Sequence, residues 1–195
     1  VMVEEYGYMG RILRVDLSTG KVWDVPTRDY AQRFLGGRGL AARIYWEEVP
    51  PEVGALDPDN RLLIFTGPLA GVPPFGGSRW TICGKSPNIS PEQFNYANVG
   101  GSWGAQLKFA GYDGLVVQGK AERPVYLLVQ DGQPQLKDAS ALWGLGAIKA
   151  RTILKEELGN TVRVLAIGPA GENMVCWCTV LADDDSSASQ GFGAV

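Results

Sequence analysis

The chain has 195 residues, of which 45% are hydrophobic, and its 18 basic and 21 acidic side chains give a formal net charge of -3. This length and apolar content are enough to bury the core of one domain. The near balance of charge, without a dense basic block, argues against nucleic acid as a partner. No apolar run approaches the roughly 20 residues that cross a bilayer, and the N-terminus lacks signal-peptide character, so we expect a cytoplasmic protein with no membrane segment.

The numbers of cysteine and histidine residues limit the kinds of catalytic and metal-binding chemistry that this chain can perform. Three cysteines, Cys83, Cys176 and Cys178, are an odd number, which favours reduced thiols over a disulfide framework. Histidine is absent, so the commonest general acid or base and the commonest metal ligand are missing from this segment. Any chemistry must therefore depend on other groups.

The N-terminal part predicts a hairpin followed by two helices. Arg11–Asp16 and Lys21–Val25 alternate in polarity and flank a turn that ends in a glycine. Thr27 is a candidate N-cap for a short helix that ends at the glycine pair 36–37. A second helix is expected over Gly39–Glu48.

The rest of the chain is rich in expected strands. These are Arg61–Thr66, Trp80–Cys83, Gly114–Val117, Val125–Gln130, Val162–Ile167 and Val175–Leu181, with one further helix over Gly146–Leu158. Most links between strands are too short for regular crossover helices. The predicted class is therefore α+β: a β-rich domain of mostly antiparallel or mixed sheets with a few short helices.

The segment Ala97–Gly119 is the most informative. An asparagine and the paired glycines Gly100 and Gly101 open an amphipathic stretch that runs into a buried-type strand. Glycine permits close approach to a ligand, and the first N–H groups of a helix have no internal partners, so the junction favours a phosphate-like ligand. Arg79, after the glycine-containing turn 73–78, is either a solvated charge or an anion ligand.

Other motifs favour structural roles. The run Gly37–Ala42 satisfies a dinucleotide fingerprint but follows a helical pattern rather than a strand. Cys176 and Cys178 would share one face of a strand, yet no second pair or histidine completes a metal site, which favours buried apolar side chains. Gly168–Asn173 is read as a packing turn, with a ligand-facing rim as the alternative.

The last residues, 183–195, stop inside a loop of small side chains. We therefore expect 1–195 to be a single N-terminal domain truncated from a longer chain.

Several motifs in this order resemble one family. Gly10–Gly20, Leu35–Leu40, Thr66–Gly71, Ala97–Gly101, Leu107–Asp113 and Ile167–Asn173 together are similar to the N-terminal domain of the aldehyde:ferredoxin oxidoreductase family. The resemblance implies a tungsten, or rarely molybdenum, enzyme in which two pterins hold the metal and a [4Fe-4S] cluster passes electrons to ferredoxin. The N-terminal domain would be the β-rich base for this cofactor, inactive alone, with helical domains further along the chain covering it and supplying the cluster cysteines.

The same resemblance implies roles for individual residues. Arg79 matches an arginine between the pterin and the cluster. Asn98 matches the residue whose backbone carbonyl binds a Mg²⁺ that bridges the two pterin phosphates, and Gly100, with its neighbour Gly101, lets those phosphates approach the backbone. Ser187 and Ser189 match a phosphate-binding loop, although Gln190 stands near the place where an arginine is common.

The implied reaction is the oxidation of an aldehyde to a carboxylic acid with ferredoxin as the acceptor. No catalytic side chain is assigned to this segment, and the substrate identity and a homo-oligomeric state stay open. The competing hypothesis is a non-enzymatic β-rich module that binds a phosphorylated small molecule or a partner protein.

Overall fold

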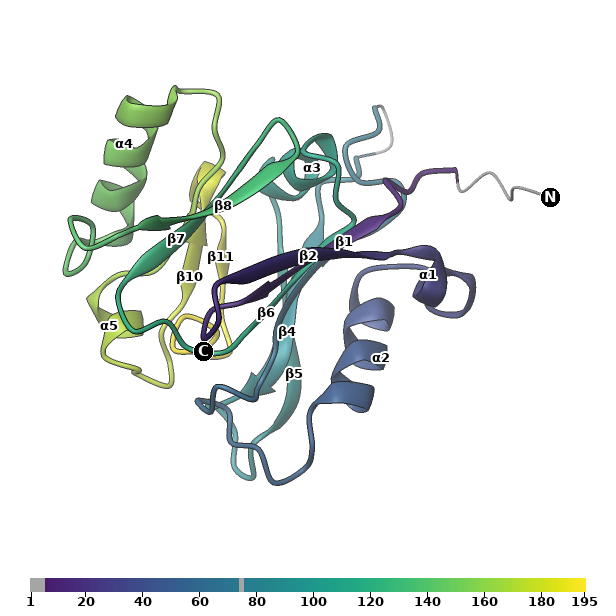
Figure 1. The fold of residues 1–195 in the computed structure, drawn as a ribbon, viewed down its shortest axis with the longest axis horizontal. Coiled ribbons are helices and arrows are strands. Elements are labelled where there is room, and N and C mark those ends of the chain that lie inside the picture. Colours follow the sequence, from purple (N-terminus) through teal and green to yellow (C-terminus); the bar gives the residue numbers. More distant parts are fainter. Residues whose placement is uncertain (1–5, 74–75) are drawn as a thin grey trace.

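The computed structural model describes residues 6–73 and 76–195, with Asp184 described by its backbone only. Its largest element is a six-stranded mixed sheet in the order β2-β1-β6-β3-β4-β5 (Figure 1). Only β1 and β6 run parallel; the other neighbours are antiparallel. The strands are β1 (Arg11–Asp16), β2 (Lys21–Pro26), β3 (Leu62–Thr66), β4 (Trp80–Ser86), β5 (Gln93–Val99) and β6 (Gly114–Gln118).

Three helices connect strands of this first sheet. They are α1 (Arg28–Phe34), α2 (Arg38–Glu48) and α3 (Trp103–Phe109). The apolar side of α2, with Leu40 and Ile44, packs on one face of the sheet together with Phe65 and Cys83. Leu107 of α3 packs on the other face, in the larger core that contains Trp80 and Ile82.

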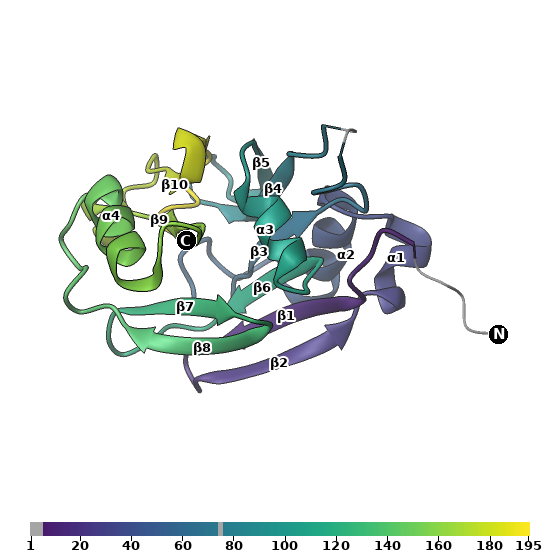
Figure 2. The same ribbon diagram turned by 90° about the horizontal axis from the view of Figure 1, so that it is seen from above.

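The second part of the chain forms smaller elements. The hairpin β7 (Val125–Gln130) and β8 (Gln133–Asp138) is followed by α4 (Ala147–Leu158) and a three-stranded antiparallel sheet in the order β11-β10-β9. In Figure 2 the hairpin lies along one side of this part of the molecule, and α4, β9 and β10 lie along the other side. The short elements are β9 (Leu165–Ala166), α5 (Pro169–Glu172), β10 (Val180–Ala182), the 3₁₀ turn η1 (Asp183–Asp185) and β11 (Ser187–Ala188).

The predicted α+β class with antiparallel and mixed sheets is confirmed. The N-terminal hairpin, the helix at Gly39–Glu48 and the helix at Gly146–Leu158 form as expected, and Ala150 and Leu154 are buried as the helical spacing requires. Among the described residues, even the longest helix is too short and too polar to cross a bilayer.

Two strand predictions were too long. Of Val162–Ile167 only Leu165–Ala166 pairs, and of Val175–Leu181 only the last two residues do. Met174 has a φ of 53°, and the N–H of Cys178 donates to the carbonyl of Val175 at 2.9 Å, so the chain turns there instead of extending. The premise that Cys176 and Cys178 lie on one strand was therefore wrong. Cys178 is buried as predicted, but Cys176 is only partly buried, because it lies in this turn.

The predicted N-cap position of Thr27 is confirmed, because Thr27 is the residue that directly precedes α1, but its side chain makes no cap hydrogen bond. Its hydroxyl instead donates to the carboxylate of Asp113, with an Oγ1–Oδ2 distance of 2.7 Å. The side chain of Thr27 therefore bonds a residue that is distant in the sequence instead of the backbone of its own helix.

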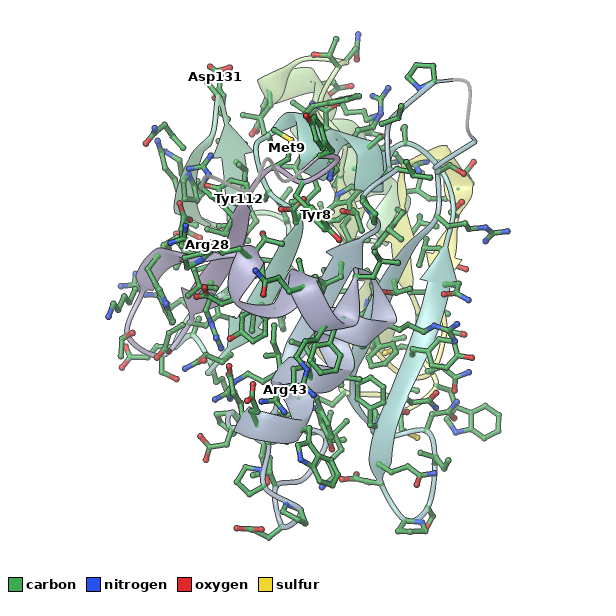
Figure 3. All side chains as sticks on the ribbon, turned by 90° about the vertical axis from the view of Figure 1, so that its right-hand side faces the viewer. Tyr8, Met9, Arg28, Arg43, Tyr112 and Asp131 are labelled. Atoms are coloured by element: carbon green, nitrogen blue, oxygen red, sulfur yellow. The ribbon has the colours of Figure 1, made fainter. Side chains whose placement is uncertain are left out.

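Asp113 organises the junction between α3 and β6. Its carboxylate accepts hydrogen bonds from the backbone N–H groups of Met9 and Gly10, from Thr27 and from the ammonium of Lys108 at 2.9 Å. Asp113 and Lys108 are 2% and 5% exposed. Figure 3 labels Tyr8, Met9 and Tyr112 at this junction. Because all these donors converge on one buried acid, the N-terminal segment is fixed to the end of the sheet.

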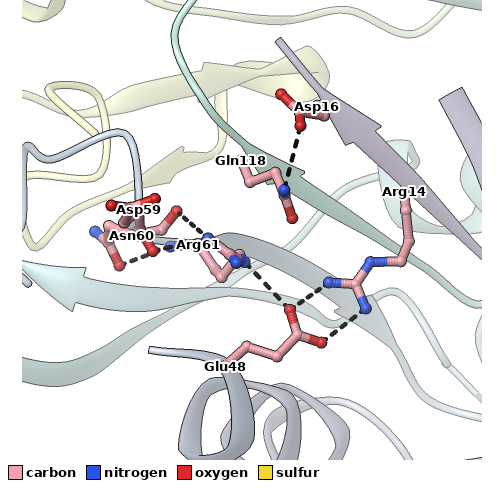
Figure 4. A network of polar contacts seen from close by, with 7 residues as sticks. All are labelled: Arg14, Asp16, Glu48, Asp59, Asn60, Arg61 and Gln118. Atoms are coloured by element: carbon pink, nitrogen blue, oxygen red, sulfur yellow. Dashed lines mark hydrogen bonds and ion pairs between the residues drawn. The ribbon is translucent and has the colours of Figure 1, made fainter. Parts of the chain in front are cut away.

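Glu48, the last residue of α2, fastens that helix to the sheet (Figure 4). Arg14 of β1 bonds both carboxylate oxygens, one of them at 2.7 Å, and Arg61 adds a third bond at 3.2 Å. Burial raises the pKa of Glu48, but the two guanidinium groups outweigh burial and the net pKa is lowered. The carboxylate therefore stays ionised and its contacts stabilise the fold at neutral pH.

Candidate functional site

The structure brings Arg79 and Gly100 together at one end of the first sheet. Trp80 pairs with Val99 and Thr81 with Asn98, so one further step of this antiparallel register sets Arg79 opposite Gly100. A Cβ at Gly100 would lie 3.9 Å from Nη1 of Arg79. Gly100 is itself held because the indole N–H of Trp80 donates to its carbonyl at 3.0 Å. Part of the turn before Arg79, residues 74 and 75, lies outside the described residues.

Asn98 lies in β5, two residues before Gly100, and is exposed. Residues directly opposite in an antiparallel pair share one face, so Asn98 and Thr81 lie on the same side of the sheet. Thr81 is 8% exposed, and its hydroxyl has no hydrogen-bond partner in the described part of the chain. The site thus contains an exposed amide next to a buried hydroxyl with unused hydrogen-bonding capacity.

The loop Ser186–Gly191 approaches the same corner from the second sheet. β11 lies beside β5, and the hydroxyl of Ser186 would be 3.7 Å from a Cβ at Gly100. Ser187, in β11, and Ser189, in the following turn, are exposed. The sequence-predicted residues therefore come from three segments, those of Arg79, of Asn98–Gly101 and of the Ser186–Gly191 loop, which meet near Gly100.

Gln190 stands near the position where the family resemblance leads one to expect an arginine, and it holds the loop in place through hydrogen bonds. Its carbonyl accepts a hydrogen bond from the hydroxyl of Ser86 at 2.8 Å, and its side-chain oxygen accepts one from Asn95 at 3.1 Å. Gln190 has a φ of 66°, in the left-handed region. The residue thus acts as a link between the loop and β4–β5 rather than as a free cation.

Two further arginines that the sequence analysis did not single out reach this corner. The guanidinium of Arg38, at the start of α2, lies 4.1 Å from the ring centroid of Tyr96, which is two residues before Asn98. Arg163 donates from Nε to the hydroxyl of Ser102 at 2.7 Å, just after Gly101. Both depend on contacts between distant segments, so neither has a local sequence signal.

Arg38, Arg79 and Arg163 thus contact three successive parts of the segment Tyr96–Ser102. Within residues 6–73 and 76–195, none of the three forms an ion pair with an acidic side chain. Unpaired guanidinium groups around a glycine turn give a positive surface suited to phosphate or carboxylate groups. Gly101, with a φ of 82°, allows the chain to reverse at this point.

The cysteines contribute little to this surface. Burial raises the pKa of Cys83 to about 12, which keeps its thiol protonated at neutral pH. The described residues contain no group of three or more His, Cys, Asp or Glu side chains placed to hold a metal ion. The corner therefore offers backbone groups, hydroxyls and guanidinium groups to a ligand, but no set of side-chain metal ligands.

The two glycine motifs of lesser interest have structural roles. Gly37 is the N-cap residue of α2, and the element before it is the helix α1, so the run Gly37–Ala42 lacks the strand that a dinucleotide site needs. A Cβ at Gly171 would lie 2.7 Å from the carbonyl of Gly193, which shows that the turn Gly168–Asn173 is a site of close packing.

Comparison with known proteins identifies the fold and its relatives. Residues 12–195 match the family described as "Aldehyde ferredoxin oxidoreductase, N-terminal domain". The tungsten-containing aldehyde ferredoxin oxidoreductase of Pyrococcus furiosus is 41% identical over 196 residues, and that of Thermococcus kodakarensis is 41% identical over 193. Each alignment covers 97% of this chain and 32% of the relative, so the chain spans about a third of their length.

A solved structure agrees with these matches. The active-site complex of benzoyl coenzyme A reductase with 1,5-dienoyl-CoA superposes with a TM-score of 0.91 at 38% identity, over 97% of this chain and 29% of that one. The family match and the two relatives together show that this chain belongs to the aldehyde ferredoxin oxidoreductase family, as its N-terminal domain.

Proposed function

We propose that this chain is the cofactor-binding base of a tungsten, or molybdenum, bis-pterin oxidoreductase that oxidises aldehydes to carboxylic acids and passes electrons to ferredoxin. The observation that carries the proposal is the corner at the end of β5. There Arg79 lies beside Gly100 and the Ser186–Gly191 loop, while Arg38 and Arg163, which form no ion pair within the described residues, contact Tyr96 and Ser102 on either side of it. A doubly phosphorylated organic ligand needs this combination of positive charge and open backbone.

The residues present fit such a ligand. The position that a Cβ of Gly100 would fill lies between the hydroxyl of Ser186 and the guanidinium of Arg79, both of which can donate hydrogen bonds. The unpartnered hydroxyl of Thr81 adds a group that a ligand or an ordered water could satisfy. Gly100, Gly101, Ser187 and Ser189 would hold the pterin phosphates, and the backbone carbonyl of Asn98 would bind a Mg²⁺ there. Arg79 would place a positive charge between the pterin and the cluster.

The chemistry itself belongs to the cofactor. When bound, the metal bis-pterin would supply the two-electron oxidation, and a [4Fe-4S] cluster would pass the electrons on singly. The described residues of this chain contribute no cluster of metal-ligating side chains, so those ligands would come from helical domains further along the chain. This domain positions the cofactor, supplies positive charge next to it and excludes water on one side. A reducing, cytoplasmic setting fits its three free cysteines.

The test is analysis of the full-length protein. We expect tungsten or molybdenum, iron and a phosphorylated pterin in stoichiometric amounts, and aldehyde-dependent reduction of ferredoxin. A well-folded full-length protein that contains none of these metals and no pterin, when produced in cells supplied with tungstate, would contradict the proposal and favour a module without redox chemistry.

A second substrate class has a specific observation in its favour. The solved structure with a TM-score of 0.91 is that of a benzoyl coenzyme A reductase complex. The loaded protein should therefore be offered both aldehydes and an aromatic acyl-coenzyme A thioester. Turnover of the thioester alone would assign the reductive reaction to this chain instead of aldehyde oxidation.

A further inference from the structure

Two residue pairs of β4 and β5 lie side by side on the face of the first sheet that α2 covers. Thr81 is opposite Asn98, and Cys83 is opposite Tyr96. Residues that are opposite each other, and residues two apart along a strand, project from the same face. Cys83 packs with the apolar side of α2, so all four side chains lie on the helix side of the sheet.

Arg38 extends over these pairs from the start of α2. The N–H of Gly37, the residue before it, donates to the carbonyl of Thr66 at the end of β3, at 2.9 Å. The guanidinium carbon of Arg38 lies 4.1 Å from the ring centroid of Tyr96 in β5. Because β4 separates β3 from β5, the side chain of Arg38 crosses β4 between these two points.

Thr81 supplies a buried hydroxyl beside this side chain. Thr81 is 8% exposed, and its Oγ1 has no hydrogen-bond partner among the described residues. Burial raises the pKa of Cys83 to about 12, and the Thr81 hydroxyl and the charge of Arg38 both act against this rise, so both groups lie near that thiol. A buried hydroxyl with unused hydrogen-bonding capacity costs stability until a ligand or a water bonds it.

The positive charge of Arg38 is not neutralised within residues 6–73 and 76–195. Arg38 is exposed and forms no ion pair with an acidic side chain of these ranges. The ring of Tyr96 covers one side of the guanidinium, so the N–H groups at its edge can donate to a ligand. Asn98, exposed beside Thr81, adds an amide that can also donate.

We propose that Arg38, Thr81 and Asn98 form a binding site for a single carboxylate group. The edge of a guanidinium matches both oxygens of a carboxylate, and the one positive charge of Arg38 balances its one negative charge. The hydroxyl of Thr81 donates a further hydrogen bond to the carboxylate and is no longer unpartnered. The ring of Tyr96, which is 39% exposed, offers an apolar surface for the body of an organic acid.

This carboxylate site is distinct from the corner at Gly100. Tyr96 lies four residues before Gly100, a separation of about 13 Å along an extended strand. Arg79, not Arg38, lies beside Gly100. Asn98 would serve the corner through its backbone carbonyl and the carboxylate site through its side-chain amide. The inference therefore goes beyond the proposed function and does not rest on it.

The carboxylate has two sources, a small organic acid or an Asp or Glu side chain of the full-length protein. The experiment measures the rate at which phenylglyoxal modifies individual arginines of that protein, read by peptide mass spectrometry with and without benzoate. Benzoate at about ten times its dissociation constant should slow the modification of Arg38 by about tenfold. Arg28, 70% exposed at its side chain on α1, should react at an unchanged rate.

Thr81→Val removes the hydroxyl and keeps the shape of the side chain. It should weaken benzoate binding by about tenfold, whereas Thr81→Ser should retain it. Without benzoate, Thr81→Val should not lower the melting temperature, because the hydroxyl has no partner among the described residues. Slow modification of Arg38 before any benzoate is added, released by Thr81→Val, would identify a side chain of the protein as the carboxylate.

Fast modification of Arg38 that benzoate does not change would overturn the proposal. Slow modification that Thr81→Val leaves unchanged would overturn it too, since another segment would then simply cover Arg38. If Thr81→Val does not fold, the effect of benzoate on the unmodified protein decides.

Gly100→Val separates the carboxylate site from the proposed function. Protection of Arg38 should persist in this variant, and also in a full-length protein that proves to contain no metal or pterin. Protection that disappears together with the cofactor would show that the group bound at Arg38 belongs to the cofactor, and would overturn the carboxylate site.

Discussion

The six-stranded sheet with α1–α3 forms the first half of the molecule, and the elements from β7 to β11 form the second half; the two differ in how far their strands pair. The strands of the first sheet are five to seven residues long, and Asp113 and the half-buried Glu48 fix the helices to it. In the second half β9, β10 and β11 are two or three residues long; there Lys155 pairs with the buried Asp183, while Asp185, the partner of Arg151, is 76% exposed at its side chain. The difference teaches that the long paired strands of the first sheet are the scaffold for Arg79 and Gly100, beside which the shorter strands place the Ser186–Gly191 loop.

The largest expected effect comes from breaking the scaffold at Asp113. Asp113→Ala leaves the ammonium of Lys108 buried without its partner and removes acceptors for Met9, Gly10 and Thr27. We expect a loss of about 3–5 kcal/mol in the free energy of unfolding, measured by chemical denaturation of the full-length protein. The control is Asp185→Asn in the second half, which removes the charge of the exposed partner of Arg151 and should cost about 1 kcal/mol or less. Equal losses in both variants would remove the contrast between the halves.

The next effect concerns Glu48 and is dependent on pH. Because its folded pKa is lowered, the contribution of Glu48 is present above its ordinary pKa of 4.5 and is lost as the pH falls through the folded pKa. Glu48→Gln should cost about 1.5–3 kcal/mol at pH 7. It should also flatten the decline of the melting temperature below about pH 4.5. A parallel decline in both proteins would show that Glu48 does not link α2 to the sheet in this way.

Arg79→Ala tests the charge that the scaffold presents. Arg79 is exposed and forms no ion pair with the described residues, so its removal should leave the melting temperature unchanged. Cofactor content per polypeptide, measured after mild dialysis, should fall by about tenfold, equivalent to about 1.4 kcal/mol. Arg28→Ala is the matched control, since Arg28 is 70% exposed at its side chain and lies on α1, away from Gly100. The interpretation fails if both variants retain cofactor equally.

The smallest effect tests the link between the halves. Ser86→Ala removes the hydrogen bond from β4 to the carbonyl of Gln190 and should cost about 1 kcal/mol of unfolding free energy. Faster hydrogen exchange should be confined to the Ser186–Gly191 loop. Unchanged exchange there would indicate that Asn95 and the surrounding packing alone hold the loop.

Much of the fold was accessible from local sequence patterns, and the misses have physical reasons. Helix α4 could be predicted because its apolar spacing and the stop signal of Gly159 agree, and α2 because its apolar spacing ends just before Pro50. Strand β8 was not predicted, although Asp131-Gly132 is a strong hairpin signal, because the polar residues of Gln133–Asp138 lack the apolar content typical of a strand. Strand β5 was missed because it is an edge strand with several polar side chains, so its pattern lacks clear apolar alternation.

Some residues of the candidate site could likewise be predicted from the sequence, and others could not. Arg79, Asn98 and Gly100 were named from motifs, and their proximity follows from the pairing of β4 with β5. Arg38 and Arg163 were not named because their places depend on how α2 and the segment before β9 pack against β5. Gln190 was read as a departure from the family pattern, whereas the structure gives it a role in holding the loop.

The most direct measurement is the tungsten and pterin content of full-length Gly100→Val relative to Gly100→Ala and the unmodified protein. A Cβ at Gly100 meets only ordinary contacts, at 3.7 and 3.9 Å, so alanine should be tolerated, while the branched side chain of valine fills the space between Ser186 and Arg79. We expect the valine variant to fold with an unchanged melting temperature and to lose most of its cofactor, with alanine in between. Full cofactor content in a folded Gly100→Val protein would contradict the account.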